Sequence, residues 1–195
     1  MRLLLPLLLG LSLAQFDPPR GDLRAVVLSD FNGPYGALEY PAALARVVRA
    51  ILEVWRPDLV LSAGDLVAGQ SAALPAPRFA EMWGAFEAAV AAPLRGAGIP
   101  FAPAVGNHDG SSLPGFERER EAARAYWAAH APELNFLDAA DFPFRYSFVA
   151  RGVFIAVWDA SSADIRFEQL EWLAEQLASP AARAAPYRVL VGHLP

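Results

Sequence analysis

The stretch that decides the fold is residues 101–110, which read Phe-Ala-Pro-Ala-Val-Gly-Asn-His-Asp-Gly. The apolar run 101–105 predicts a buried β-strand, and it ends directly in a block of polar residues. In open α/β sheets the ligand crevice lies at the carboxyl ends of the strands. Asn107 and His108 are therefore candidates for a functional site, although residues of these types also occur in turns.

Three further apolar runs end in the same manner. The runs 23–29, 59–62 and 187–191 each predict a strand, and polar residues with a nearby glycine follow each one. The candidate metal-binding residues at the four strand ends are Asp30, Asn32, Asp65, Asn107, His108 and His193. We expect them to converge in space. Carboxylate, amide and imidazole ligands suit divalent ions such as Mn, Fe, Zn or Mg.

Helical patterns alternate with these strands, which predicts an α/β fold with a largely parallel sheet under helical cover. The segments 145–149 and 153–159 resemble an antiparallel pair. We interpret the run 23–29 as a strand buried on both faces, because it is apolar throughout. The expected helices are 41–55, 78–95, 117–130 and 167–178.

The composition limits the class of protein. With 195 residues, 55% of them hydrophobic and 19% charged, the chain has enough apolar material for one globular domain. The sequence contains no Cys, which excludes disulfides and thiolate metal ligands. A net charge of −5 argues against a nucleic acid as a stable partner, because such binders gather Lys and Arg on one face.

The first 14 residues have the pattern of a signal peptide. Arg2 precedes an apolar run at 3–13, and small residues lead to an expected cleavage after Ala14. A bilayer-spanning helix needs about 20 apolar residues, so a run of this length predicts no stable membrane anchor. We therefore expect an exported protein, periplasmic or extracellular, with a leader at 15–22 and one domain over 23–195.

Four blocks of the sequence resemble motif blocks of the calcineurin-like metallophosphoesterases. They are Ser-Asp-Phe-Asn-Gly at 29–33, Gly-Asp at 64–65, Gly-Asn-His-Asp at 106–109 and Gly-His-Leu-Pro at 192–195. The segment Gln-Leu-Glu-Trp-Leu at 169–173 also resembles exported members of the family. The resemblance implies an αββα sandwich, in which two β-sheets are flanked by helices. It further implies an enzyme that hydrolyses phosphate mono- or diesters of small molecules.

The resemblance also implies a role for each candidate residue. The implied metal ligands are Asp30 and Asn32 for a first ion, Asn107 and His193 for a second, and Asp65 as the bridge between them. His108 would donate a proton to the leaving group. Two divalent ions would hold a bridging hydroxide for attack on phosphorus.

Three departures from the family pattern bear on these expectations. Asn32 stands where the family has His, and its harder amide oxygen favours Mn or Mg, of which we expect Mn. Ala68 and Gly69 replace the Asp and Arg of the protein phosphatases, which argues against that branch. A fifth block, Gly-His-x-His, does not occur, so we expect a fold that is incomplete at its C-terminus. The alternative function is a non-catalytic or inactive form that keeps the fold and partial metal binding.

Several single residues have a plain structural alternative. Asp30 and Asp65 could cap the turns that follow their strands. We interpret His130 as a favourable cation at a helix end, and Asp159 as a hydrogen-bonding partner of a nearby turn. Tyr35 could touch the substrate. The sequence determines neither the oligomeric state nor the identity of the metal and the substrate.

Overall fold

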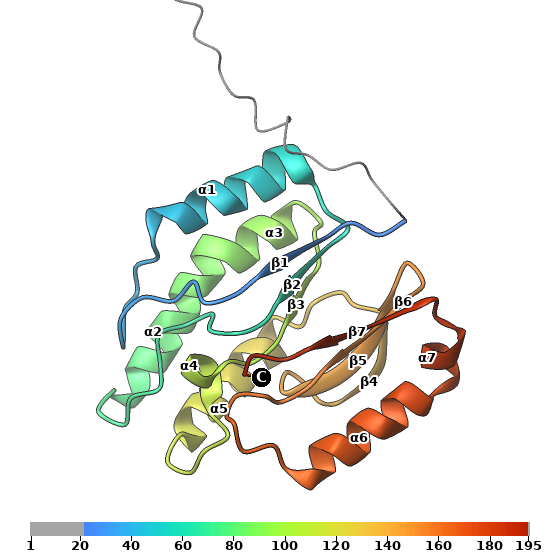
Figure 1. The fold of residues 1–195 in the computed structure, drawn as a ribbon. Helices are drawn as coiled ribbons and strands as arrows, with labels where there is room; N and C mark the ends of the chain where they lie inside the picture. Colours follow the sequence, from blue (N-terminus) through green and yellow to red (C-terminus); the bar gives the residue numbers. More distant parts are fainter. Residues whose placement is uncertain (1–21, 195) are drawn as a thin grey trace, which may run out of the picture.

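Two β-sheets pack face to face in the computed structural model, which describes residues 22–194 (Figure 1). The first sheet is parallel and has the order β1 (Ala25–Leu28), β2 (Leu59–Ser62) and β3 (Phe101–Pro103). The second sheet has the order β4 (Phe136–Asp141), β5 (Arg145–Ala150), β6 (Val153–Val157) and β7 (Tyr187–Val191). Strands β4, β5 and β6 are antiparallel, whereas β7 joins β6 in parallel.

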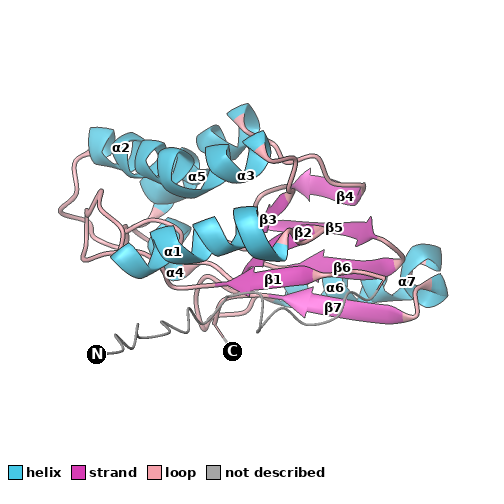
Figure 2. Cartoon of the chain, turned by 90° about the horizontal axis from the view of Figure 1, so that it is seen from above, coloured by secondary structure: helices cyan, strands magenta, loops and turns pink. Residues whose placement is uncertain are grey.

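Helices cover the outer faces of both sheets, as Figure 1 shows. The first sheet carries α1 (Ala42–Ala50) with its π-helical continuation Ile51–Trp55, then α2 (Ala76–Phe86), the π-helical Glu87–Ala91 and α3 (Ala92–Gly96). The helix α5 (Glu117–Ala129) packs beside α2 (Figure 2), and α4 (Asn107–Gly110) is a short turn after β3. The second sheet carries α6 (Phe167–Ala178) and α7 (Pro180–Ala184).

The buried side chains form three layers that match this order of elements. Between the sheets lie Leu61, Ala102, Phe148, Ile155 and Val157, among others. Beneath the helices of the first sheet an aromatic cluster forms around Trp83, Phe86, Tyr126 and Trp127. Beneath α6 and α7 lie Phe154, Trp172 and Ala182. The expected αββα sandwich is therefore confirmed.

One expectation drawn from the sequence pattern is wrong, and a second is confirmed only in part. The run 23–29 is not buried on both faces: Val27 is 64% exposed, and β1 is an edge strand with β2 as its single strand neighbour within the described residues. The largely parallel sheet exists only as the first sheet. The expected antiparallel pair is confirmed as the hairpin of β5 and β6, which together with β4 and the parallel strand β7 forms a separate mixed sheet.

The N-terminal expectations fall largely on residues that the structure does not describe. The signal peptide at 1–14 and the leader up to residue 21 lie outside residues 22–194. Within 22–194, none of the helices combines the length and the apolar character that crossing a bilayer requires.

A hydrogen bond between the two sheets gives the first prediction. The fully buried Tyr146 on β5 donates its hydroxyl proton to the carbonyl oxygen of Pro103 on β3, at 2.7 Å. Tyr146→Phe removes this bond and should lower the free energy of unfolding by about 0.5 to 1.5 kcal/mol in a denaturant titration. Tyr187→Phe is the matched control, since Tyr187 is 71% exposed and its loss should be within about 0.5 kcal/mol. An equal effect of both substitutions would contradict the prediction.

Candidate metal centre

Three ligand-bearing side chains from three strand ends lie together. Asp30 follows β1, Asp65 follows β2 and His193 follows β7. Each offers one ligand atom, and these atoms all lie within 4.8 Å of one another. Because β7 belongs to the second sheet, the group forms where the carboxyl ends of β1, β2 and β7 come together, close to α4 (Figure 1).

Asn107 adds a fourth donor atom to this group. Its Oδ1 lies 2.8 Å from the Nε2 of His193, which is itself 3.3 Å from Oδ1 of Asp65. The Nδ2 of Asn107 donates a hydrogen bond to Oε1 of Gln70 at 2.7 Å. Gln70 therefore turns the carbonyl side of the amide toward the other ligands.

The imidazole of His193 is held by a backbone group on its far side. Its Nδ1 donates to the carbonyl oxygen of Ala63 at 2.8 Å, so Nε2 faces Asp65 and Asn107. This arrangement is typical of histidine ligands, whose second nitrogen is usually fixed by a carbonyl or a carboxylate. The hydrogen bond to the Asp65 carboxylate raises the pKa of His193 to about 9, despite its partial burial. The negative charges of Asp65 and Asp30 add to this shift.

The backbone is unusual at the same place. Among residues 22–194, five non-glycine residues have a positive φ, and three of them belong to this site. They are Asp30 at 53°, Asp65 at 58° and Gln70 at 65°. Such conformations cost energy in residues with a Cβ and cluster at functional sites.

Two close approaches hold the second and third motif blocks against each other. A Cβ on Gly106 would lie 2.3 Å from the backbone nitrogen of Asp65, so only glycine fits there. The buried Asp109 accepts hydrogen bonds from the N–H groups of Leu66 and Val67 through Oδ1 and from that of Gly106 through Oδ2, at 2.6 to 2.8 Å. Burial raises the pKa of Asp109 to about 7, and the charge of Asp65 adds to this shift.

His108 lies beside the metal ligands. Its Nδ1 is 3.1 Å from the carbonyl oxygen of Gly69, and its Nε2 is 3.9 Å from Oδ2 of Asp65. Its ring stacks on that of Tyr35, with 5.2 Å between centroids and 19° between planes. The imidazole therefore has one nitrogen fixed by the backbone and the other turned toward the Asp65 carboxylate.

Three other residues singled out in the sequence lie outside this group of ligand atoms or have no contact among the described residues that places them in it. Asn32 is partly buried in the loop after Asp30, and its role as a ligand stays a prediction. Asp159 accepts from Ser161 and forms an ion pair with Arg120 at 2.6 Å, in agreement with a structural role. His130 ends α5, where its Nδ1 lies 2.9 Å from the carbonyl oxygen of Tyr126.

Sequence reasoning missed two residues that support the site. Gln70 orients Asn107, as described above. Glu119 on α5 is buried, and its carboxylate accepts hydrogen bonds from the N–H groups of Gln70 and Ser71, which fixes the loop. Neither residue carries a sequence signal, because Gln70 lies in an irregular segment and Glu119 lies in a helix rich in Glu and Arg.

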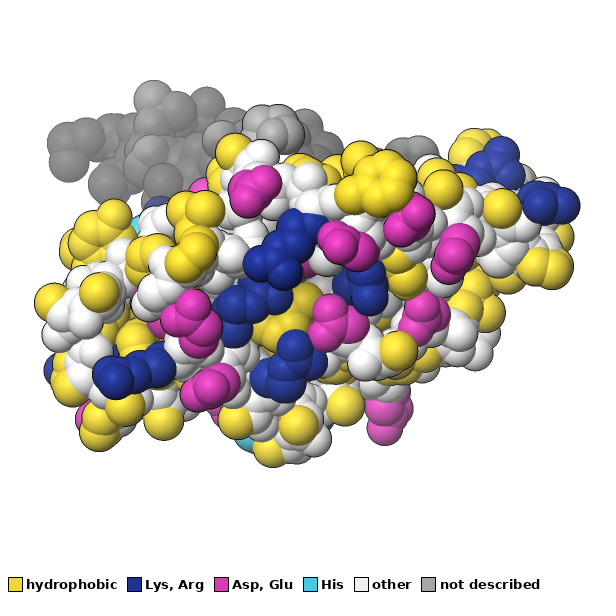
Figure 3. Space-filling model, turned by 90° about the horizontal axis from the view of Figure 1, so that it is seen from below, with side chains coloured by type: hydrophobic (Ala, Val, Ile, Leu, Met, Phe, Trp, Pro, Cys, Tyr) yellow, Lys and Arg dark blue, Asp and Glu magenta, His cyan; other side chains and the backbone are white. Residues whose placement is uncertain are grey.

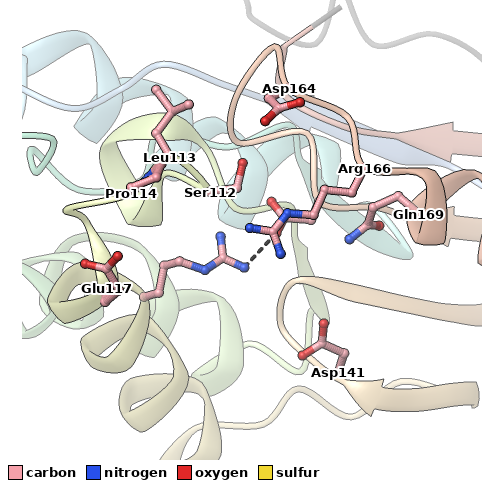
Figure 4. Close-up of a pocket in the computed structure, with 10 residues that line it drawn as sticks. Ser112, Leu113, Pro114, Glu117, Asp141, Asp164, Arg166 and Gln169 are labelled. Carbon is pink, nitrogen blue, oxygen red and sulfur yellow. Dashed lines mark hydrogen bonds and ion pairs between the residues drawn. The ribbon is translucent and has the colours of Figure 1, made fainter.

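A pocket of about 290 Å³ lies next to the loop that follows α4 (Figure 4). Its charged lining residues are Glu117, Arg120, Asp141, Asp159, Asp164 and Arg166. Arg120 forms an ion pair with Asp159 and also donates to the carbonyl oxygen of Gly110, the last residue of α4. The pocket therefore has mixed charges that partly neutralise one another, and Arg120 connects it to α4.

The tight contact at Gly106 gives the second prediction. Gly106→Ala would force Asp65 and its loop to move, so we expect a loss of about 1 to 3 kcal/mol in the free energy of unfolding and weaker Mn binding. Gly84→Ala is the matched control, because nothing lies within 4 Å of a Cβ at this position in α2. It should raise stability by about 0.5 to 1 kcal/mol. Urea unfolding and Mn titration would measure both, and a harmless Gly106→Ala would refute the argument.

Comparisons with known proteins agree with this geometry. The family of the calcineurin-like phosphoesterases matches residues 23–195, which include all four motif blocks. A comparison with curated proteins gave no significant match. The family acts on phosphate esters and depends on divalent metal ions. Because the match extends over most of the sequence, the chain belongs to the calcineurin-like phosphoesterase family.

Proposed function

We propose that the protein hydrolyses phosphate esters of small molecules with two divalent metal ions bound at the centre described above. The observation that carries the proposal is the convergence of Asp30, Asp65 and His193, joined by Asn107. This set combines two carboxylates, an amide oxygen and an imidazole, which fits divalent cations. The set is rich in oxygen, and Asn32 would add a further oxygen ligand as the motif resemblance implies, so we propose Mn as the metal.

The electrostatics of this donor set also support a cation. Asp30 and Asp65 hold two carboxylates near each other, and their negative charge contributes to the raised pKa of His193. A bound cation reverses this local repulsion. Divalent ions there would activate water for attack on phosphorus and would offset charge on the phosphoryl oxygens.

His108 supplies the second element of the proposed reaction. With Nδ1 donating to Gly69, its Nε2 is the nitrogen that faces the metal ligands. A protonated Nε2 would deliver its proton to the leaving-group oxygen when the ester bond breaks. His108 would therefore act on the leaving group, whereas Asn107 would act on the metal.

The surface supports a small substrate rather than a nucleic acid. Figure 3 shows Arg side chains lying among acidic ones on one face of the molecule. A nucleic-acid binder neutralises many phosphates and needs basic side chains concentrated along a groove. The net charge of −5 points in the same direction.

The division of roles between two adjacent residues gives the third prediction. His108→Ala should keep its bound Mn and lose rate on an aryl phosphate ester by about 10²- to 10⁴-fold, least for good leaving groups. Asn107→Ala should instead lose one equivalent of Mn. Metal analysis and initial rates would measure both effects. His130→Ala is the control, since His130 lies at the end of α5 and should change neither quantity.

Two outcomes would contradict this proposal. Equal loss of Mn in His108→Ala and Asn107→Ala would refute the separate roles. Stoichiometric Mn binding by the unaltered protein, without turnover of aryl phosphate mono- or diesters, would favour the alternative of a non-catalytic member that keeps the fold and part of the metal site.

We also propose export from the cytoplasm, on the pattern of residues 1–14 alone. The fourth prediction is that N-terminal sequencing of periplasmic or secreted protein starts at Gln15, because the peptidase would cut after Ala14. Recovery of the protein from the cytosol with Met1 still in place would refute export.

A further inference from the structure

We infer that Tyr35 is a positioning residue for His108, an inference that rests on the proposed role of His108 as proton donor. The two rings are stacked, with centroids 5.2 Å apart and planes inclined by 19°. The Gly69 carbonyl holds the edge of the imidazole, and Tyr35 covers one of its faces. Together these contacts fix the direction of the imidazole Nε2.

The loop that carries Tyr35 is attached to the segment that holds the edge of the imidazole. Gly36 donates its backbone N–H to the carbonyl oxygen of Ala68 at 2.6 Å. Ala68 directly precedes Gly69, whose carbonyl oxygen contacts Nδ1 of His108. Both contacts of the imidazole ring therefore depend on the same short piece of chain, and the ring and its stacking partner keep their relative position.

Packing in the hydrophobic core does not explain why the Tyr35 ring lies against His108. Its side chain is 62% exposed, and its hydroxyl makes none of the hydrogen bonds found among the described residues. One face of the ring contacts His108, and much of the remainder faces solvent. Replacement of Tyr35 should therefore leave the fold intact and change mainly the mobility of the imidazole.

The kinetic consequence follows from this geometry. A general acid works only when its proton lies within hydrogen-bond reach of the leaving-group oxygen. Without the stacked ring, the imidazole can tilt about its side-chain bonds, so fewer bound substrates meet a correctly directed Nε2. We expect Tyr35→Leu to lower kcat about two- to tenfold, the size that one aromatic stacking contact supports. KM and the Mn content should stay unchanged.

A nuclear magnetic resonance experiment on the full chain tests the contact without any need for activity. The sequence has three His residues, so the Hε1 resonances are few, and the His108 signal can be assigned by its loss in His108→Ala. A proton above an aromatic ring resonates upfield. The His108 signal should move downfield in Tyr35→Leu and stay in place in Tyr35→Phe, which keeps the ring. The His130 signal is an internal reference, because it depends on the separate stack with Tyr126.

Kinetics of the same variants complete the test. Tyr35→Phe should restore kcat, and Tyr187→Leu, which removes another exposed tyrosine on β7, should leave kcat and the His108 signal unchanged. An unmoved His108 signal in Tyr35→Leu would overturn the inference. So would a moved signal with unchanged kcat, or a change confined to KM. If the unaltered chain shows no turnover, the proposed function fails, and the position of the His108 signal alone decides whether Tyr35 holds the ring.

Discussion

One buried carboxyl group joins the two loops on which the rest of the site depends. Asp109 accepts hydrogen bonds from Leu66 and Val67 in the loop after β2 and from Gly106 at the start of α4. A buried group of this kind is tolerated because its oxygens have several donors, and its loss would leave buried N–H groups without partners. The second and third motif blocks therefore keep a fixed relation that does not require a metal.

The fold holds two of the metal ligands close together although their negative charges repel each other. Asp30 and Asp65 bring two carboxylates together on left-handed backbone, an arrangement that only the surrounding structure can maintain. The two carboxylates raise the pKa of His193, because they stabilise its protonated form. A metal ion would take the place of that proton, because ligation requires the neutral imidazole. A divalent cation bound among these side chains would therefore balance the two negative charges.

Much of this arrangement could be predicted from the sequence, because the ends of buried strands can be recognised in it. Buried runs such as 59–62 and 101–105 locate the strands, and the polar residues after them locate the site. The supporting residues could not be found in this way. Gln70 acts on Asn107, which is 37 residues away, and Glu119 acts on Gln70, which is 49 residues away. No periodicity in the sequence indicates such contacts. Strand β4 could not be predicted from the sequence either, because it lacks the alternation of polar and apolar residues. Its pairing with β5 is irregular as well.

The separation into two sheets was not predicted from the pattern, yet it shapes the site. His193 comes from the second sheet, whereas Asp30, Asp65 and Asn107 come from the first. Any sliding of one sheet on the other would therefore change the ligand geometry. The apolar layer between the sheets opposes such sliding, since close-packed side chains resist small shifts. Next to His193, a Cβ on Gly192 would lie 2.3 Å from the indole nitrogen of Trp158, so the chain leaves β7 along a narrow path. The packing of the two sheets consequently determines the geometry of the metal centre.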